Sequence, residues 1–371
     1  MNARDLPPQH AEVLIIGAGQ AGLALAHQLR LLGTEMQVID QAPTIGHSWA
    51  RRWDSLRLFT PAQFSGLDEQ PFPGPRWDHP SAEQVALYLS AFARRHQLPV
   101  TLQTRATALR EYPGGYLVET DTAQHWTARH VIVATGPFGV PRRPAWANSL
   151  SRAVVQLHSD DYQSPEQIAH QQVLVVGGGN TGHQIALELA QAGRTVHLAE
   201  SRRSRHLPQR IIGRDIFAWL TSAGVLDLPT GSRLGRRLRA NEPVIGTPRR
   251  ALRRAGVTFH PRAVGGAGKM VHFESGRHEH VGSVIWATGY QHNDRWIDVP
   301  RALDPSGVLV TQDGITPARG LFTIGRSWQQ NRGSALLGFV SHDARRLAQR
   351  IHANSSPAPT NTDRRGIAAH S

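Results

Sequence analysis

The chain has 371 residues, of which 41 are Lys or Arg and 28 are Asp or Glu, and it contains no cysteine. At about 150 residues per domain, this length suggests two or three domains, each able to bury a core. The lack of cysteine excludes disulfides, thiolate metal sites, cysteine nucleophiles and dithiol electron relays. The longest apolar runs, VLII and VLVV, are far shorter than the roughly 18 residues that cross a bilayer, which predicts no membrane contact. The N-terminus shows no cleavage-site pattern, so we expect a cytoplasmic protein.

The formal charge of +13 invites comparison with nucleic-acid-binding proteins. The arginines, however, are spread along the chain and do not form a basic tail or block. We therefore favour an ordinary arginine-rich surface and predict no nucleic-acid partner. An anionic substrate or a phosphate-bearing cofactor is compatible with this charge.

An apolar run at residues 13–16 leads directly into the sequence GAGQAG at 17–22. A run without alternation predicts a parallel strand covered on both faces, and a helical pattern follows the glycines. Gly17 permits a tight turn, Gly19 lets the backbone approach a pyrophosphate, and Gly22 lets the helix pack closely on the strand. The N-terminus of such a helix carries about half a positive charge, which favours a phosphate there.

Asp40 ends the next predicted strand, 23 residues after Gly17. That spacing is close to the one at which an acidic side chain accepts a hydrogen bond from the 2′-hydroxyl of a bound ribose. The order strand, glycines, helix, strand and acid predicts a dinucleotide site rather than a plain glycine-rich turn. Its candidate residues are Gly17, Gly19, Gln20, Ala21, Gly22 and Asp40.

The same pattern returns at residues 173–200, with GGGNTG at 177–182 and Glu200 again 23 residues after the first glycine. Two such units predict two bound dinucleotides, and a second copy that packs without a ligand is the alternative. Polar side chains at the second turn favour a bound ligand. The candidate residues here are Gly177, Gly179, Asn180, Thr181 and Gly182.

Glu200 and the residues after it give opposite indications about the second cofactor. An acid at this place favours NAD by accepting from the ribose, whereas Arg202 and Arg203 offer the positive charge that a 2′-phosphate needs. A charge-assisted contact contributes about 1.5–3 kcal/mol, so two arginines within reach should outweigh one acid. We predict that Arg202 and Arg203 bind the cofactor, with solvated loop arginines as the alternative.

Two further strands, HVIVATG at 130–136 and SVIWATG at 283–289, end in the same tripeptide, and each follows short alternating segments. This repetition predicts an α/β fold with two Rossmann-like dinucleotide-binding domains. The second domain is expected to be inserted in the first, and each carries a small antiparallel insert. The ends of these strands, with that of a later strand, add as cofactor candidates Ala134, Thr135, Gly136, Ala287, Thr288, Gly289 and Gly325.

The domain boundaries follow from the expectation that the chain returns from the second domain to complete the first. We assign residues 1–160 and 290–353 to the first domain and residues 161–289 to the second. Residues 354–371 are rich in Ser, Pro, Thr and Asn and are expected to form a disordered tail.

Together these motifs resemble the flavin-containing monooxygenase family, particularly its bacterial and YUCCA-like members. GAGQAG with Asp40 looks like the FAD turn of the family, GGGNTG like its NADPH turn, and IGHSW at 45–49 like its IGGxW segment. The stretch WDSLRLFTP at 53–61 is similar to the segment beside the flavin, although it lacks the Asn that many members carry. The signature between the domains keeps only His158 and Tyr162 of its four fixed positions.

The resemblance implies FAD and NADPH as cofactors, with O₂ and a small organic molecule as substrates. One oxygen atom would pass from an adduct at the flavin C4a atom to a nitrogen or sulfur of the substrate. YUCCA-type oxidative decarboxylation and Baeyer-Villiger oxidation are alternatives within the family. An NADPH-flavin electron-transfer reductase and a non-enzymatic redox sensor are alternatives outside it, and a homodimer is left open.

The family pattern also supplies candidates for the reacting pocket. The catalytic candidates are Asn180, Trp328, Asn331 and Arg57, and Trp49 joins the cofactor-binding set. Arg57 would pair with the carboxylate of a 2-oxo acid if the substrate is one. We expect His158 to hold the link between the domains rather than to carry a proton. The HEH sequence at 278–280 lacks a third ligand at metal spacing, so we predict no metal site.

Overall fold

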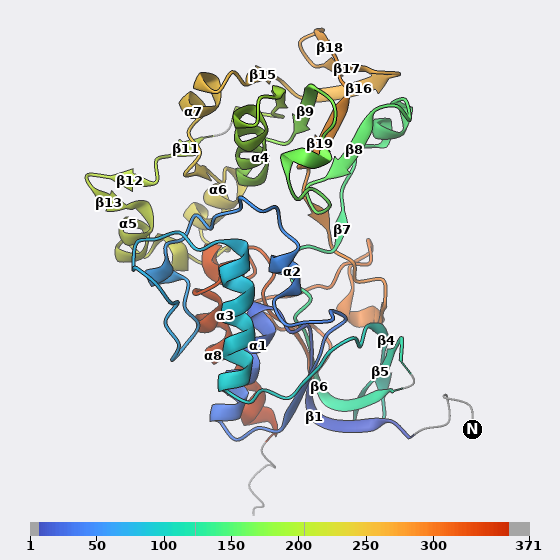
Figure 1. The fold of residues 1–371 in the computed structure, drawn as a ribbon. Helices are drawn as coiled ribbons and strands as arrows, with labels where there is room; N and C mark the ends of the chain where they lie inside the picture. The colour runs from blue at the N-terminus through green and yellow to red at the C-terminus, as the bar shows by residue number, and fades with distance from the viewer. Residues whose placement is uncertain (1–6, 123, 204, 356–371) are drawn as a thin grey trace, which may run out of the picture.

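The computed structural model describes residues 7–122, 124–203 and 205–355 and shows two lobes, each built on its own sheet (Figure 1). The predicted tail lies outside the described residues, except that residues 354 and 355 end the last helix. Within the described ranges, no helix is long and apolar enough to cross a membrane.

The lower lobe in Figure 1 contains an eight-stranded sheet. Strand β1 (Gln9–Ile16) lies inside it, between parallel β2 (Met36–Ile39) and parallel β6 (Trp126–Val133). Residues 13–15 are completely buried, as expected for a strand covered on both faces. The remaining strands are β3 (Val100–Thr101), β4 (Ala106–Tyr112), β5 (Gly115–Thr120), β21 (Ile297–Asp298) and β22 (Leu321–Thr323).

The predicted antiparallel insert of the first domain is confirmed, because β4, β5 and β6 pair in antiparallel order. The last strand, β22, returns to this sheet and pairs in parallel with β6. Helix α1 (Gln20–Leu31) packs against both α3 (Ala82–Arg95) and α8 (Val340–Ser355), so the two ends of the described chain share one core. The first domain is therefore discontinuous in sequence, as predicted.

The upper lobe contains a five-stranded parallel sheet in the order β15, β10, β9, β19, β8. Its strands are β8 (Val155–His158), β9 (Gln172–Val176), β10 (Thr195–Ala199), β15 (Thr258–His260) and β19 (Ser283–Trp286). Helix α4 (Asn180–Gln191) follows β9, and α7 (Arg249–Arg254) precedes β15. The small antiparallel sheet predicted for this domain consists of β16 (Ala263–Ala267), β17 (Met270–Phe273) and β18 (His278–His280).

The chain passes between the lobes earlier than the sequence analysis placed it. Strands β7 (Val140–Pro141) and β20 (Tyr290–Gln291) pair antiparallel where the chain leaves the first lobe and returns to it. Strand β8 follows that crossing and pairs with β19, so it belongs to the second sheet although the expected boundary at 160 put it in the first. A four-residue strand without a glycine signal gives too little pattern to assign from sequence.

A segment between β10 and β15, residues 206–248, forms a helical insert that the sequence analysis did not predict. Its elements are β11 (His206–Leu207), β12 (Arg210–Ile211), β13 (Arg214–Asp215), α5 (Ile216–Ser222), α6 (Arg233–Ala240) and β14 (Val244–Ile245). Apolar side chains of the insert pack against the first lobe, with Phe217 and Ile245 on one side and Phe59, Leu336 and Phe339 on the other. The insert therefore closes the gap between the lobes with a core of its own.

The other short helical segments lie in connections. They are α2 (His47–Ala50) and the 3₁₀ turns η1 (Ala62–Phe64), η2 (Ala145–Ser149), η3 (Pro165–Gln167), η4 (Val225–Asp227), η5 (Pro300–Ala302) and η6 (Arg332–Ala335).

Replacing Tyr162 by Phe should lower the free energy of unfolding by about 1–3 kcal/mol, because the change removes one donor to a partly buried carboxylate. Tyr162 is fully buried, and its hydroxyl donates to Glu188 Oε2 of α4 at 2.8 Å. Urea unfolding followed by circular dichroism measures the change. Tyr112→Phe is the matched control, since Tyr112 is 47% exposed and should be neutral; equal effects of the two changes would contradict the expectation.

Candidate cofactor-binding site

The first glycine turn joins β1 to α1, and its backbone packs closely against neighbouring backbone at two of its three glycines. Gly17 has a φ of +116°, and a Cβ atom there would lie 2.5 Å from the carbonyl oxygen of Ala134. A Cβ atom on Gly22 would lie 1.9 Å from the carbonyl oxygen of Gly17. These two glycines are therefore required by the fold itself, and they bring the start of α1 against the end of β6.

Gly19 differs from its two neighbours, because a Cβ atom there would meet nothing within 4 Å. It is the N-cap of α1, and no side chain caps this 12-residue helix. The free N–H groups of the first turn thus face open space, which is the arrangement that accepts a phosphate group. The turn thus has room for a phosphate group beside Gly19, and the pyrophosphate contact itself stays a prediction.

Asp40 braces the same turn from the end of β2. Its Oδ2 accepts from the Ala18 N–H at 2.6 Å, and its Oδ1 accepts from the Ala42 N–H at 2.7 Å. Each carboxylate oxygen has two acceptor positions, so Asp40 keeps capacity for a ribose hydroxyl. The partial exposure of Asp40 is consistent with that contact.

Segments that are distant in sequence meet the first turn. The Gln20 side chain donates to the carbonyl oxygen of Ala335 at 2.9 Å and accepts from Trp49 Nε1 at 3.0 Å. A Cβ atom on Gly325 would lie 2.5 Å from the Cβ of Ala21. Thr135, which follows β6, is exposed near the tip of the strand.

The predicted residues of the first site therefore lie together at one edge of the sheet. Gly136, where the chain turns away from this edge, has a φ of +75°.

The second turn repeats this geometry between β9 and α4. Gly177 has a φ of +134°, and a Cβ atom there would lie 2.1 Å from the carbonyl oxygen of Ala287. A Cβ on Gly182 would lie 2.0 Å from the carbonyl oxygen of Gly177, whereas Gly179 again faces open space. Two turns of the same shape thus stand ready for phosphate groups.

Polar candidates at the second turn are partly engaged by the protein. The side-chain oxygen of Asn180 accepts from the Ile245 N–H at 2.8 Å and so anchors the insert to the turn. The Thr288 hydroxyl donates to the carbonyl oxygen of Arg142, close to Gly289 at the crossing of the lobes. Thr181 lies in the first turn of α4 and is half-buried.

Glu200, at the end of β10, is buried and forms an ion pair with Arg249 of α7. Burial acts to raise its pKa, but the neighbouring His183 and Arg249 outweigh that effect and hold the pKa of Glu200 below its ordinary value. Arg202 is exposed and donates to Asn241 Oδ1 at 3.3 Å, and Arg203 is exposed as well. Arg249 was not among the site residues predicted from sequence, because 49 positions separate it from Glu200.

Trp328 and Asn331 lie where the insert meets the first lobe. Trp328 Nε1 donates to Glu242 Oε2 at 3.1 Å, and Arg332 forms an ion pair with the same carboxylate. Asn331 caps the 3₁₀ turn η6. Burial lowers the pKa of the Arg332 guanidinium, against the influence of Glu242. Arg332 was not among the predicted site residues, since a lone arginine in a loop carries no pattern.

Arg57 is exposed rather than enclosed, but its backbone joins the two halves of the site. Its carbonyl oxygen accepts from Gln184 Nε2 of α4 at 3.5 Å. Two residues further on, the carbonyl oxygen of Phe59 accepts from Gln209 Nε2 of the insert at 3.0 Å. The 53–61 segment thus runs between the first lobe and the second turn.

His158 is a structural link, in agreement with the role expected from sequence. Its Nε2–H donates to the carbonyl oxygen of Gly289 at 3.1 Å, and its Nδ1 accepts from the Asp160 N–H at 3.1 Å. Burial lowers the pKa of this fully buried ring. Both nitrogens are used in holding the crossing segments together.

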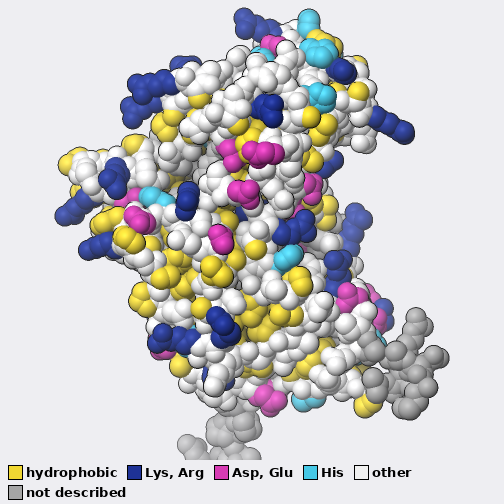
Figure 2. All heavy atoms as spheres, viewed as in Figure 1, with side chains coloured by type: hydrophobic (Ala, Val, Ile, Leu, Met, Phe, Trp, Pro, Cys, Tyr) yellow, Lys and Arg dark blue, Asp and Glu magenta, His cyan; other side chains and the backbone are white. Residues whose placement is uncertain are grey.

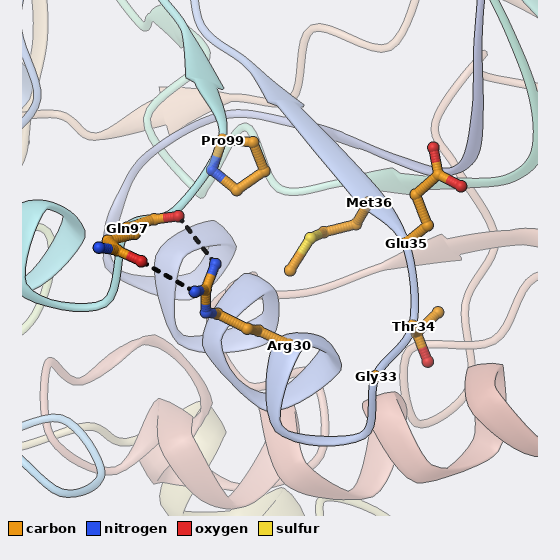
Figure 3. A pocket seen from close by; sticks show the side chains of 7 residues that line it. All are labelled: Arg30, Gly33, Thr34, Glu35, Met36, Gln97 and Pro99. Atoms are coloured by element: carbon orange, nitrogen blue, oxygen red, sulfur yellow. Dashed lines mark hydrogen bonds between the residues drawn. The ribbon is translucent and has the colours of Figure 1, made fainter.

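A hollow of about 330 Å³ lies away from both turns, at the opposite edge of the first sheet (Figure 3). Met36 begins β2 and Pro99 precedes β3, so this hollow marks the amino ends of those strands. Arg30 donates to the backbone and side-chain oxygens of Gln97, both at 3.1 Å, and these bonds form one wall. Parallel α/β sheets bind ligands at the carboxyl ends of their strands, which are here the ends that carry the glycine turns.

The arginines are more concentrated than the sequence analysis held. Residues 201–256 contain 13 arginines against Asp215, Asp227 and Glu242, a formal excess of ten positive charges out of the +13 of the chain. Helix α6 carries four of these arginines, all exposed. In Figure 2 many of the Lys and Arg side chains lie at the upper left, where Figure 1 shows α7 and the β12–β13 hairpin. Most of the net positive charge therefore belongs to the segment that follows the second dinucleotide unit, while other Lys and Arg side chains lie elsewhere on the face in Figure 2.

Histidines and glutamates form three groups of metal-site size among the described residues. The groups are His27, Glu69 and His96; His183, Glu200 and His206; and His197, His260 and Glu279. In the third group His197 Nδ1 and His260 Nε2 are already hydrogen-bonded to each other at 2.9 Å. In the second, Arg249 is paired with the carboxylate, which disfavours a cation there. The absence of a metal stays a prediction.

Comparisons with known proteins agree with this geometry. A family model described as pyridine nucleotide-disulphide oxidoreductase matches residues 14–216. A CzcO-like uncharacterized oxidoreductase of Geobacillus kaustophilus is 37% identical over 346 residues, covering 92% of this chain and 99% of its own. Indole-3-pyruvate monooxygenase YUCCA1 of Oryza sativa subsp. japonica is 28% identical over 377 residues, or 91% of each chain. A flavin-containing monooxygenase structure from Stenotrophomonas maltophilia superposes with a TM-score of 0.79 at 24% identity, covering 94% of this chain and all of the other.

Replacing Gly19 by Val should leave a folded protein that purifies with little flavin, because the new side chain enters open space that the pyrophosphate needs. Gly22→Ala, the control inside the same turn, should instead reduce the yield of folded protein, since its Cβ meets the Gly17 carbonyl. Circular dichroism and the ratio of flavin to protein absorbance separate the two effects. Full flavin content in Gly19→Val would show that the pyrophosphate binds elsewhere.

Proposed function

Since the chain belongs to the pyridine nucleotide-disulphide oxidoreductase family, in its flavin-containing monooxygenase group, we propose that it is an FAD-dependent, NADPH-consuming monooxygenase. It would insert one oxygen atom of O₂ into a small organic substrate, at nitrogen or sulfur, with NADPH supplying the two electrons that reduce the other atom to water. The observation that carries the proposal is the pair of open glycine turns joined by the 53–61 segment, in a chain without cysteine.

The first turn would hold FAD. The N–H groups at the start of α1, which no side chain caps, would bind the pyrophosphate, and Asp40 would accept from the adenosine ribose. Trp49 and Gln20, which are hydrogen-bonded to each other, would border the remainder of the cofactor. When bound, the flavin supplies the electron transfer and oxygen activation, and the protein supplies position and shielding.

The second turn would hold NADPH. Its open position at Gly179 would receive the pyrophosphate, and the exposed Arg202 and Arg203, which follow β10, would bind the 2′-phosphate. The surrounding excess of arginine would attract a cofactor that carries several negative charges.

The helical insert would exclude water from the space between the cofactors. Phe217 and Ile245 pack on Phe59 and Leu336, and the Thr230 N–H donates to the carbonyl oxygen of Gln330 at 2.8 Å. A monooxygenase needs this closure, because water entering the site releases peroxide in place of oxidised product. Trp328, held by Glu242, is part of the same closed surface.

Two alternatives have an observation in their favour. The YUCCA relative supports oxidative decarboxylation of a 2-oxo acid, for which the exposed Arg57 would bind the carboxylate. The matching family model includes disulphide oxidoreductases, but the cysteine pair of such enzymes is missing. Without cysteines, the only reductase compatible with this chain is one that passes electrons from the flavin to another protein. The basic second lobe would suit an acidic electron-carrier protein.

Changing Arg202 and Arg203 together to Ala should raise the KM for NADPH about tenfold or more, with much less effect on NADH, because only the 2′-phosphate contact is lost. Steady-state oxidation of both nucleotides by the flavin-loaded enzyme measures this. Equal losses with NADPH and NADH would mean that the two arginines act on structure alone.

Oxygen accounting tests the reaction itself. With ¹⁸O₂, NADPH and a panel of amines, sulfides, ketones and 2-oxo acids, we expect at least one product that carries one ¹⁸O atom, formed in step with NADPH consumption. Product chemistry then separates heteroatom oxidation from Baeyer-Villiger oxidation and decarboxylation. Stoichiometric hydrogen peroxide with every substrate, together with fast reduction of an acidic ferredoxin, would instead support the reductase.

A further inference from the structure

Glu200, the acid that by its position after β10 would favour NAD, is buried in this chain. Resting on the proposed function of the second turn, we propose that Arg249 and His183 are specificity-determining residues that withdraw Glu200 from the ribose and thereby favour NADPH. An unpaired carboxylate at the end of β10 would accept from the 2′-hydroxyl of NAD and would repel a 2′-phosphate. The neutralised carboxylate does neither.

One oxygen of Glu200 is paired, and the other lies beside a buried ring. Oε2 is paired with a terminal nitrogen of Arg249, and Oε1 lies 3.2 Å from His183 Nε2. The carboxylate side chain is only 3% exposed, although the acid stands at the end of a strand beside the glycine turn. To reach a ribose, Glu200 would have to leave both partners.

His183 lies between the second turn and Glu200. Its Nδ1 lies 3.0 Å from the carbonyl oxygen of Gly179, which only accepts, so Nδ1 carries a hydrogen. Its Nε2 faces Glu200 Oε1 at 3.2 Å, in a contact that is not aligned as a hydrogen bond. The fully buried ring therefore fills the space on one side of the carboxylate, and Arg249 supplies the opposite charge on the other.

Arg249 is held in place by contacts of its own. It begins α7 after Pro248, and its guanidinium carbon lies 3.7 Å from the ring centroid of Phe259 on the neighbouring strand. The Nε atom of Arg249 is buried and has no hydrogen-bond partner. The orientation of the guanidinium group is therefore set by the ring of Phe259 and by the carboxylate of Glu200. The side chain remains 19% exposed, so part of the guanidinium group is accessible from solvent.

The test compares 2′-phospho-ADP-ribose with ADP-ribose, which differ only in the 2′-phosphate, by calorimetry on the flavin-loaded protein. Wild type should prefer the phosphorylated ligand. Arg249→Ala should reduce that preference about tenfold or more, weakening the phosphorylated ligand and strengthening ADP-ribose as Glu200 turns outward. Arg250→Ala removes the same charge from the next, exposed residue of α7 and should leave the preference unchanged.

A double variant keeps the result interpretable. Arg249→Ala leaves a carboxylate with one partner fewer and can lower stability, whereas Arg249→Ala/Glu200→Gln removes both charges. If Glu200 causes the gain in ADP-ribose binding, the double variant loses that gain. An unchanged preference in folded Arg249→Ala, or a gain that survives in the double variant, overturns the inference and leaves the proposed function standing. Failure of the wild-type protein to bind either ligand overturns the NADPH assignment, and the inference with it.

Discussion

Close backbone approach at the two glycine turns is the constraint on which the rest of the structure depends. At each turn the first glycine faces the carbonyl of the return strand, Ala134 or Ala287, and the third faces the carbonyl of the first. No side chain fits in either contact. The helix start, the strand end and the return strand are therefore fixed relative to one another, and the middle glycine is left facing open space.

The second constraint is the joining of the two lobes. Two short strands cross between them, and His158 links residues 131 positions apart by bonding to Gly289. The helical insert adds an apolar cluster that includes Phe59 and Leu336 of the first lobe. Binding sites on separate lobes act together only when their separation is fixed, and these contacts fix it.

Charge is distributed according to this architecture. Most of the excess arginine belongs to residues 201–256, beside the turn assigned to the more highly charged nucleotide. Arg249 does more than add to this charge, because it pairs with the one acid at the end of β10. The electrostatic potential at the end of β10 thus depends on which arginine pairs with Glu200. It does not depend only on how many arginines lie near the turn in sequence.

By itself, the sequence determined both glycine turns, the strands and the helix beside each of them, and the insertion of one domain in the other. Each turn is set by residues within about 30 positions, where glycine spacing and apolar runs carry the information. The insertion follows from the recurrence of the same pattern later in the chain. Only the tertiary structure decided the position of β8, the insert, the pairing of Trp328 with Glu242 and the burial of Glu200. Glu200 and Arg249 lie 49 positions apart, and Trp328 and Glu242 lie 86 positions apart. A single charged or aromatic side chain has no sequence pattern from which a distant partner could be predicted. Its contacts are therefore determined only by the packing of the two sheets and the insert.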